Sequence, residues 1–147
     1  MITWGPELRV GWEEIDAQHK EILVRVADLH DRLEQGDEFG AQAALAALTD
    51  TVVLHFATEQ DLMERSGYPD RAGHQGAHDL FLQDLHALSA ELDEMGFSEH
   101  VIDWVRGRMT EWITFHIRTN DLPLGRHLSR LRHRAGAVPA PHKSQQS

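Results

Sequence analysis

Apolar residues recur at alternating spacings of three and four along four stretches of the chain, at about residues 16–36, 41–66, 70–96 and 98–116. This spacing places them on one face of a helix, where they can pack against a core. In the first stretch and just before it these positions are Ile15, Ile22, Val26, Leu29 and Leu33. Asp16 can cap the start of this helix and Gly36 can end it. Four such helices with short links predict an all-α fold, an up-down-up-down antiparallel four-helix bundle.

The two ends of the chain differ from the four helical stretches. Residues 1–15 carry two tryptophans and two glycines, and we expect an N-terminal arm packed on the bundle. We expect the bundle itself to span residues 16–131. Residues 132–147 contain two prolines among small and polar residues, which predicts a disordered tail.

Composition excludes several kinds of chemistry. The chain has no cysteine among its 147 residues, so it has no disulfide, no thiolate metal site and no thiol nucleophile. Any metal must therefore bind nitrogen and oxygen donors. The absence of cysteine also suits a reducing cytoplasm.

Charge and hydropathy predict few macromolecular partners. The net charge of -10, from 14 basic and 24 acidic residues, argues against nonspecific binding of nucleic acid or of an anionic membrane. The N-terminal residues lack the basic and apolar regions of a signal peptide, and no apolar stretch looks long enough to cross a bilayer. We therefore expect a cytoplasmic protein that neither inserts into membranes nor binds nucleic acid.

Polar side chains interrupt the apolar stripes at positions that should be buried. One histidine alone on such a face is more often a hydrogen-bonded core residue than a metal ligand. Several of them, distributed over all four helices together with a carboxylate, are better explained by one metal centre, because unpaired buried polar groups cost free energy. These residues are His19, His55, Glu59, His74, His78 and His116.

Two pairs within this set have the spacing of ligands from one helix. His55 and Glu59 differ by four residues, as do His74 and His78, so each pair is stacked on one helical face. Either pair alone is a weak signal for a metal site. Together they predict that two helices each direct two donors to the same centre.

Asp121 is the seventh candidate, although its spacing is less regular. It follows His116 by five residues, which on a continuous α-helix would point the two side chains apart. Pro123 predicts that the helix is distorted or ends there, which would let Asp121 turn inward. Taken alone, Asp121 is a capping or surface residue.

In chain order the motifs are a single histidine in "DAQHK", then "HFATE", "HQGAH" and "HIRTND". Together with "VGWEEIDAQHKEIL" and the "GYP" link after the second motif, this set resembles the hemerythrin family, specifically its single-domain bacterial members. The resemblance extends from the N-terminal arm to about residue 128. It implies two non-heme iron ions with an oxo or hydroxo bridge.

The resemblance also implies a role for each of the seven residues. One iron would be bound by His74, His78 and His116. The other would be bound by His19 and His55, and Glu59 and Asp121 would bridge the two. Counting the oxo or hydroxo bridge as well, the first iron then has six donors and the second only five, which leaves one open position for dioxygen.

Reversible dioxygen binding, for oxygen storage, transport or delivery, is the function that this asymmetry implies, and we expect no enzymatic activity. Three apolar residues lie within one helical turn of a histidine ligand: Ile22 follows His19, Phe56 is next to His55, and Ile113 precedes His116. We expect them to line the oxygen pocket, although core packing alone explains them equally well. Two alternatives stay open. One is an oxygen or redox sensor, which in this family is usually fused to a signalling domain, and the other is a di-iron enzyme that reduces peroxide or nitric oxide. The sequence does not name a protein that receives the oxygen.

Overall fold

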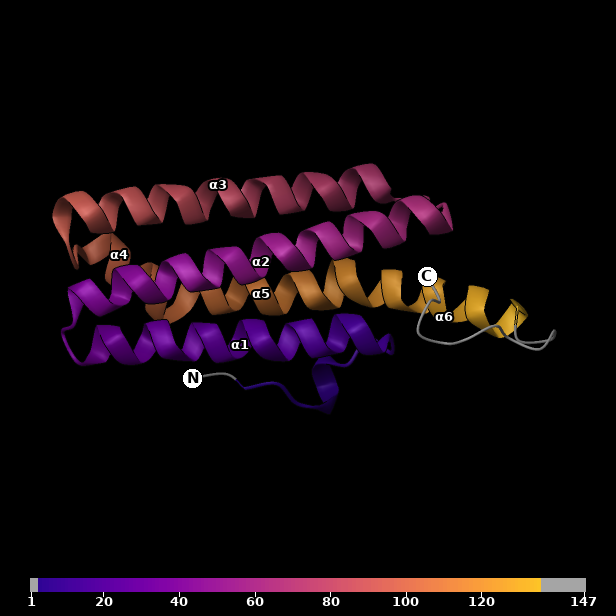
Figure 1. Ribbon diagram of the computed structural model, residues 1–147, viewed down its shortest axis with the longest axis horizontal. Coiled ribbons are helices and arrows are strands. Elements are labelled where there is room, and N and C mark those ends of the chain that lie inside the picture. Colours follow the sequence, from indigo (N-terminus) through magenta and orange to yellow (C-terminus); the bar gives the residue numbers. More distant parts are fainter. Residues whose placement is uncertain (1–2, 136–147) are drawn as a thin grey trace.

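The computed structural model describes residues 3–135, and in this part of the chain every regular element is helical. Three long helices run back and forth along the molecule, α1 (Glu13–Glu34), α2 (Glu38–Ser66) and α3 (Arg71–Met95) (Figure 1). A short 3₁₀ helix, η1 (Pro6–Leu8), lies in the arm that precedes them. The fold is the predicted antiparallel four-helix bundle.

The fourth helix of the bundle is continuous but changes its winding along its length. Two π-helical segments interrupt the α-helical ones. In these segments the backbone N–H groups donate to the carbonyl oxygen five residues earlier, whereas in an α-helix they donate to the one four residues earlier. Its consecutive segments are α4 (Glu99–Asp103), η2 (Trp104–Arg108), α5 (Met109–His116), η3 (Ile117–Asp121) and α6 (Leu122–Ala135). This helix closes the bundle, since α4 contacts α3 and η2 contacts α1.

Pro123 does not end the fourth helix, which was one of the two expected outcomes. The proline lacks an N–H to donate, and it is the second residue of α6, just after the π-helical turn η3, where the regular hydrogen-bond ladder is already interrupted. The helix continues to Ala135, past the expected end of the bundle at residue 131. The rest of the predicted tail, residues 136–147, lies outside the described residues.

Asp16 does not cap the first helix, contrary to the sequence prediction. Helix α1 begins at Glu13, and Asp16 lies buried within its first turn. Its carboxylate accepts hydrogen bonds from the backbone N–H groups of Val10 (2.8 Å) and Gly11 (3.2 Å). Asp16 therefore joins the arm to α1, and it is available for this because the helix starts earlier than expected.

The arm packs against the bundle at α6. Val10 and Trp12 are buried, and the guanidinium group of Arg132 stacks 3.9 Å from the ring centroid of Trp12. Ser129 donates a hydrogen bond to the carbonyl of Gly11 (3.2 Å). The last part of the fourth helix is thus held from the side by the start of the chain.

Helix α2 is long and apolar enough to cross a membrane by length and composition alone, so the prediction that no stretch meets this criterion was wrong. In the structure, this helix packs against α1 and α3. Its buried face carries His55 and Glu59 among apolar residues. A core helix of a bundle meets the same criterion.

The close approach of arm and helix predicts the effect of enlarging Gly125. A Cβ atom at Gly125 would overlap the backbone carbonyl oxygen of Val10, whereas one at Gly107, in the same helix, would meet nothing. We expect Gly125→Ala to lower the free energy of unfolding by about 1–3 kcal/mol, the usual range for overpacking, and Gly107→Ala to leave it unchanged or raise it. Urea unfolding of both variants measures this. Equal stability of the two variants would contradict the tight contact.

Candidate metal centre

All seven residues predicted as ligands come together in the middle of the bundle. Each is buried, and they come from α1, α2, α3, α5 and η3. Donor atoms form two groups, and within each group all atoms lie within 4.8 Å of one another. One group is Glu59, His74, His78, His116 and Asp121, and the other is His19, His55, Glu59 and Asp121. The two carboxylates belong to both groups.

The π-helical segment explains how Asp121 reaches the cluster. In η3 the chain bonds residue i to residue i+5, so five residues make slightly more than one turn. His116 and Asp121 therefore lie on the same side of the helix, with His116 Nε2 3.1 Å from Asp121 Oδ1. The expected distortion is present, but it is a widening of the helix.

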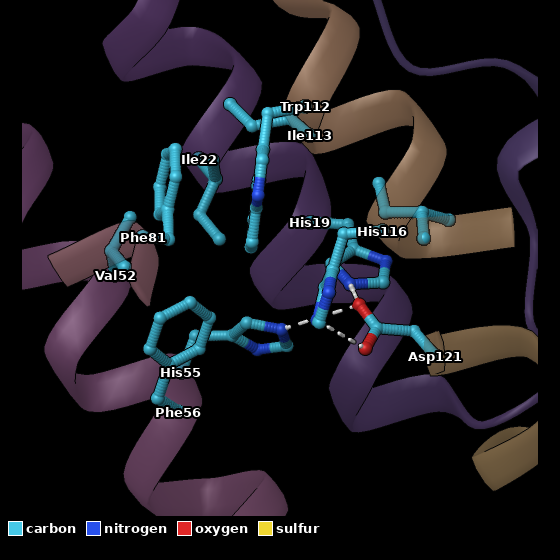
Figure 2. A pocket seen from close by; sticks show the side chains of 11 residues that line it. His19, Ile22, Val52, His55, Phe56, Phe81, Trp112, Ile113, His116 and Asp121 are labelled. Carbon is cyan, nitrogen blue, oxygen red and sulfur yellow. Dashed lines mark hydrogen bonds and ion pairs between the residues drawn. The ribbon is translucent and has the colours of Figure 1, made fainter. Parts of the chain in front are cut away.

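Each carboxylate lies among several imidazoles. Asp121 Oδ2 lies 2.7 Å from His19 Nε2, and Asp121 Oδ1 lies 3.1 Å from His74 Nε2. Glu59 Oε1 lies 3.0 Å from His78 Nε2 and 3.2 Å from His74 Nε2. Figure 2 shows His19, His55, His116 and Asp121 pointing toward one another. The cluster is a compact set of nitrogen and oxygen donors.

Burial controls the protonation of these groups. It lowers the pKa of His55 to about 4 and that of His78 to about 2, so both imidazoles are neutral at pH 7. Burial also raises the pKa of Glu59, and the neighbouring Asp121 raises it further. His74 differs, because the nearby carboxylates of Asp121 and Glu59 outweigh its burial and raise its pKa to about 9.

Several donor atoms of the cluster have no hydrogen-bond partner. Four of them lie 3.0–3.5 Å from a carboxylate oxygen or an imidazole nitrogen without forming a hydrogen bond with it. The atoms without a partner are His55 Nε2, His78 Nε2, His116 Nε2, Glu59 Oε2 and Asp121 Oδ1. Unpaired buried polar atoms are costly, and imidazole and carboxylate donors together suit divalent transition metals. The residues therefore fit a pair of metal ions that share the two carboxylates.

An apolar cavity of about 20 Å³ adjoins one side of the cluster. Ile22, Phe56 and Ile113 line it, as the sequence predicted, and so do His19 and His55 (Figure 2). A cavity needs roughly 10–15 Å³ by this measure to hold one water molecule. The space therefore suits a single small molecule beside the cluster, which borders the cavity through His19, His55, His116 and Asp121.

Sequence reasoning missed part of the cavity wall. Trp112 and Phe81 both line it, and they stack on each other with ring centroids 3.9 Å apart. Trp112 also stacks on His116, at 4.6 Å between centroids. Both aromatics belong to the apolar stripes, so the helical period could place them in the core but could not show that they border the cavity.

Gln18 is the other residue that the sequence did not reveal. Its side-chain oxygen lies 2.7 Å from Nδ1 of His55, and its side-chain nitrogen lies 3.0 Å from the hydroxyl oxygen of Thr58. Gln18 precedes His19 and lies beside the apolar stripe of α1. The spacing of apolar residues along the helix therefore gives no indication of its role.

Comparison with known proteins agrees with this geometry. The family model described as the hemerythrin HHE cation binding domain matches residues 10–127. The chain belongs to the hemerythrin family. A bacteriohemerythrin from Pseudomonas aeruginosa is 34% identical over 121 residues, which cover 82% of this chain and 76% of the relative. Another, from Methylococcus capsulatus, is 35% identical over 113 residues, which cover 71% and 86%.

Solved structures of hemerythrin show the same fold. The crystal structure of a wild-type hemerythrin is similar with a TM-score of 0.80 at 31% sequence identity. The superposition covers 88% of this chain and 98% of that chain. This chain thus has the bundle of the solved hemerythrin, and in this bundle it carries the seven buried donors described above.

The unpaired donors predict that the site costs stability when no metal is bound. His78 is neutral, fully buried and without a hydrogen bond on either ring nitrogen. We expect His78→Leu to raise the free energy of unfolding of the metal-free protein by about 1 kcal/mol, because an unsatisfied polar group leaves the core. Bound metal should stabilise the variant less than the wild type.

His86 provides the control, since it is exposed on the same helix. His86→Leu should change neither quantity. Urea unfolding with chelator and with added Fe²⁺, without air, measures both. A metal-free His78→Leu variant less stable than the wild type would contradict the prediction.

Proposed function

We propose that the protein binds dioxygen reversibly at a non-heme di-iron centre, for oxygen storage, transport or delivery. The observation that carries this proposal is the apolar cavity that adjoins the metal-binding cluster, which it meets at His19, His55, His116 and Asp121. When bound, the iron pair would supply an open coordination position and the electrons needed to hold dioxygen. An oxo or hydroxo bridge would complete the centre.

The grouping of donors supports the role of each residue. His74, His78 and His116 would hold one iron, while His19 and His55 would hold the other. Glu59 and Asp121 would bind both, because each belongs to both groups of donors. Both histidines of the ion with fewer protein ligands line the cavity, whereas only His116 of the other ion's three histidines does.

The walls of the cavity favour binding over turnover. Their polar side chains that could exchange a proton are His19, His55, His116 and Asp121, and all of these would hold metal. The described lining therefore offers no separate acid or base to protonate a bound ligand. The apolar side chains exclude water, which would slow oxidation of a bound iron pair. A cysteine-free chain suits the cytoplasm, where we propose that it acts.

Oxygen binding is tested by reconstituting the metal-free protein with Fe²⁺ under anaerobic conditions. We expect two iron ions per chain, and an absorption spectrum that appears with air and disappears on deoxygenation. Steady consumption of dioxygen, peroxide or nitric oxide would instead support a di-iron enzyme. An iron-loaded protein whose spectrum does not respond to air would contradict the proposal.

The polarity of the cavity should set the rate of autoxidation. Ile113 is buried in its wall, so Ile113→Thr would admit a hydrogen-bonding group and water beside the open position. We expect this variant to convert to the diferric form severalfold faster in air, measured from the decay of the oxygenated spectrum. Val105→Thr, a buried change in the same helix that does not line the cavity, should autoxidise at the wild-type rate. Equal rates in all three proteins would contradict a role for the apolar wall.

A further inference from the structure

We propose that Thr58 and Gln18 act as positioning residues that fix the proton of His55 on Nδ1. This leaves Nε2 of His55 as a permanent lone-pair donor for the metal ion beside the cavity. The inference rests on the proposed function, because it assumes that His55 binds a metal ion. Its first test, however, uses the metal-free protein.

The positioning residues form a chain of hydrogen bonds, here called the relay, which runs from Leu54 through Thr58 and Gln18 to His55. It begins at a backbone carbonyl of α2. Thr58 donates its hydroxyl hydrogen to the carbonyl oxygen of Leu54 (3.1 Å). With that hydrogen used, the Thr58 oxygen is left as an acceptor, and it receives a hydrogen bond from the side-chain NH₂ of Gln18 (3.0 Å). The orientation of the Gln18 amide is therefore set by Thr58, with its NH₂ toward the hydroxyl.

The amide orientation decides the tautomer of His55. The side-chain oxygen of Gln18 is an acceptor only, and it lies 2.7 Å from Nδ1 of His55. Nδ1 must therefore carry the hydrogen that it donates to Gln18. Nε2 of the neutral ring then has a lone pair, and this atom is buried without a hydrogen-bond partner. The chain from Leu54 to His55 thus prepares one metal donor before any metal binds.

The relay is specific to one side of the cluster. The outer ring nitrogens, Nδ1, of His19, His74 and His78 are buried without a hydrogen-bond partner. His55 is held by a side-chain acceptor from a neighbouring helix, and it borders the cavity. A hydrogen bond to the outer nitrogen orients an imidazole and raises its basicity as a ligand. Gln18 would therefore strengthen binding of the ion that has fewer protein ligands.

Removing the acceptor should move the proton. In Gln18→Met the outer nitrogen of His55 loses its partner, while Nε2 lies 3.5 Å from Glu59 Oε1 and 3.9 Å from Asp121 Oδ2. These carboxylates are the acceptors that remain, so we expect the Nε2–H tautomer to gain population. Long-range ¹H–¹⁵N spectra of the metal-free protein, labelled with ¹⁵N-histidine, distinguish the two tautomers.

Variants of Thr58 separate the relay from general packing. Thr58→Val leaves the Gln18 amide free to rotate and should give a mixture of tautomers, whereas Thr58→Ser keeps the hydroxyl and should restore the wild-type spectrum. Thr51→Val is the matched control, because Thr51 makes the same hydroxyl-to-carbonyl bond to Ala47 (2.9 Å) outside the relay. It should leave the His55 signals unchanged.

Metal binding gives the second readout. Titration of the metal-free proteins with Co²⁺ against a chromophoric chelator should show two ions in each, with the weaker affinity reduced roughly 10–100-fold in Gln18→Met, the usual effect of losing such a partner. Gln75→Met, beside His74 on α3, should bind like the wild type, because Gln75 hydrogen-bonds the exposed side chain of Asp79.

The two measurements fail for different reasons. A wild-type His55 that carries its proton on Nε2, or a tautomer unchanged in Gln18→Met, would overturn the relay. A wild-type protein that binds fewer than two ions would contradict the proposed function instead, and the tautomer result would still decide whether the relay exists.

Discussion

The structure depends on the burial of five imidazoles and two carboxylates inside an apolar helical core. Such groups are costly to bury when they cannot satisfy one another, and here several donor atoms are buried without a hydrogen-bond partner. The chain tolerates this arrangement because the rest of the bundle core is apolar and well covered. Metal ions would convert the same atoms from a cost into a source of stability.

The fourth helix supplies His116 and Asp121 to the site, and the N-terminal arm packs on the same helix just after them. The π-helical turn η3 brings Asp121 onto the side of His116, which a regular α-helix could not do at this spacing. The arm then packs on α6 directly after this turn, where Gly125 permits contact with the backbone of Val10. Asp121, one of the two carboxylates shared by both groups of donors, thus lies next to the part of the helix that the arm holds in place.

Helical periodicity predicted the bundle and six of the seven buried donors, because residues three or four apart share a face whatever the details of packing. Asp121 was predicted only with the help of Pro123, since a π-helical turn has no periodic signal of its own. The same limit explains the error at Asp16, whose carboxylate bonds to the arm through contacts that depend on tertiary structure. Gln18 escaped prediction because a residue that orients a ligand from a neighbouring helix need not lie on the apolar stripe.

The central claim is that seven side chains from every helix of the bundle hold two metal ions. Anomalous diffraction at the iron edge, from crystals of the iron-loaded protein, tests it most directly. The account predicts two iron peaks within the cluster, one surrounded by His74, His78 and His116 and the other by His19 and His55, with Glu59 and Asp121 between them. A single peak, or iron bound away from these residues, would contradict it.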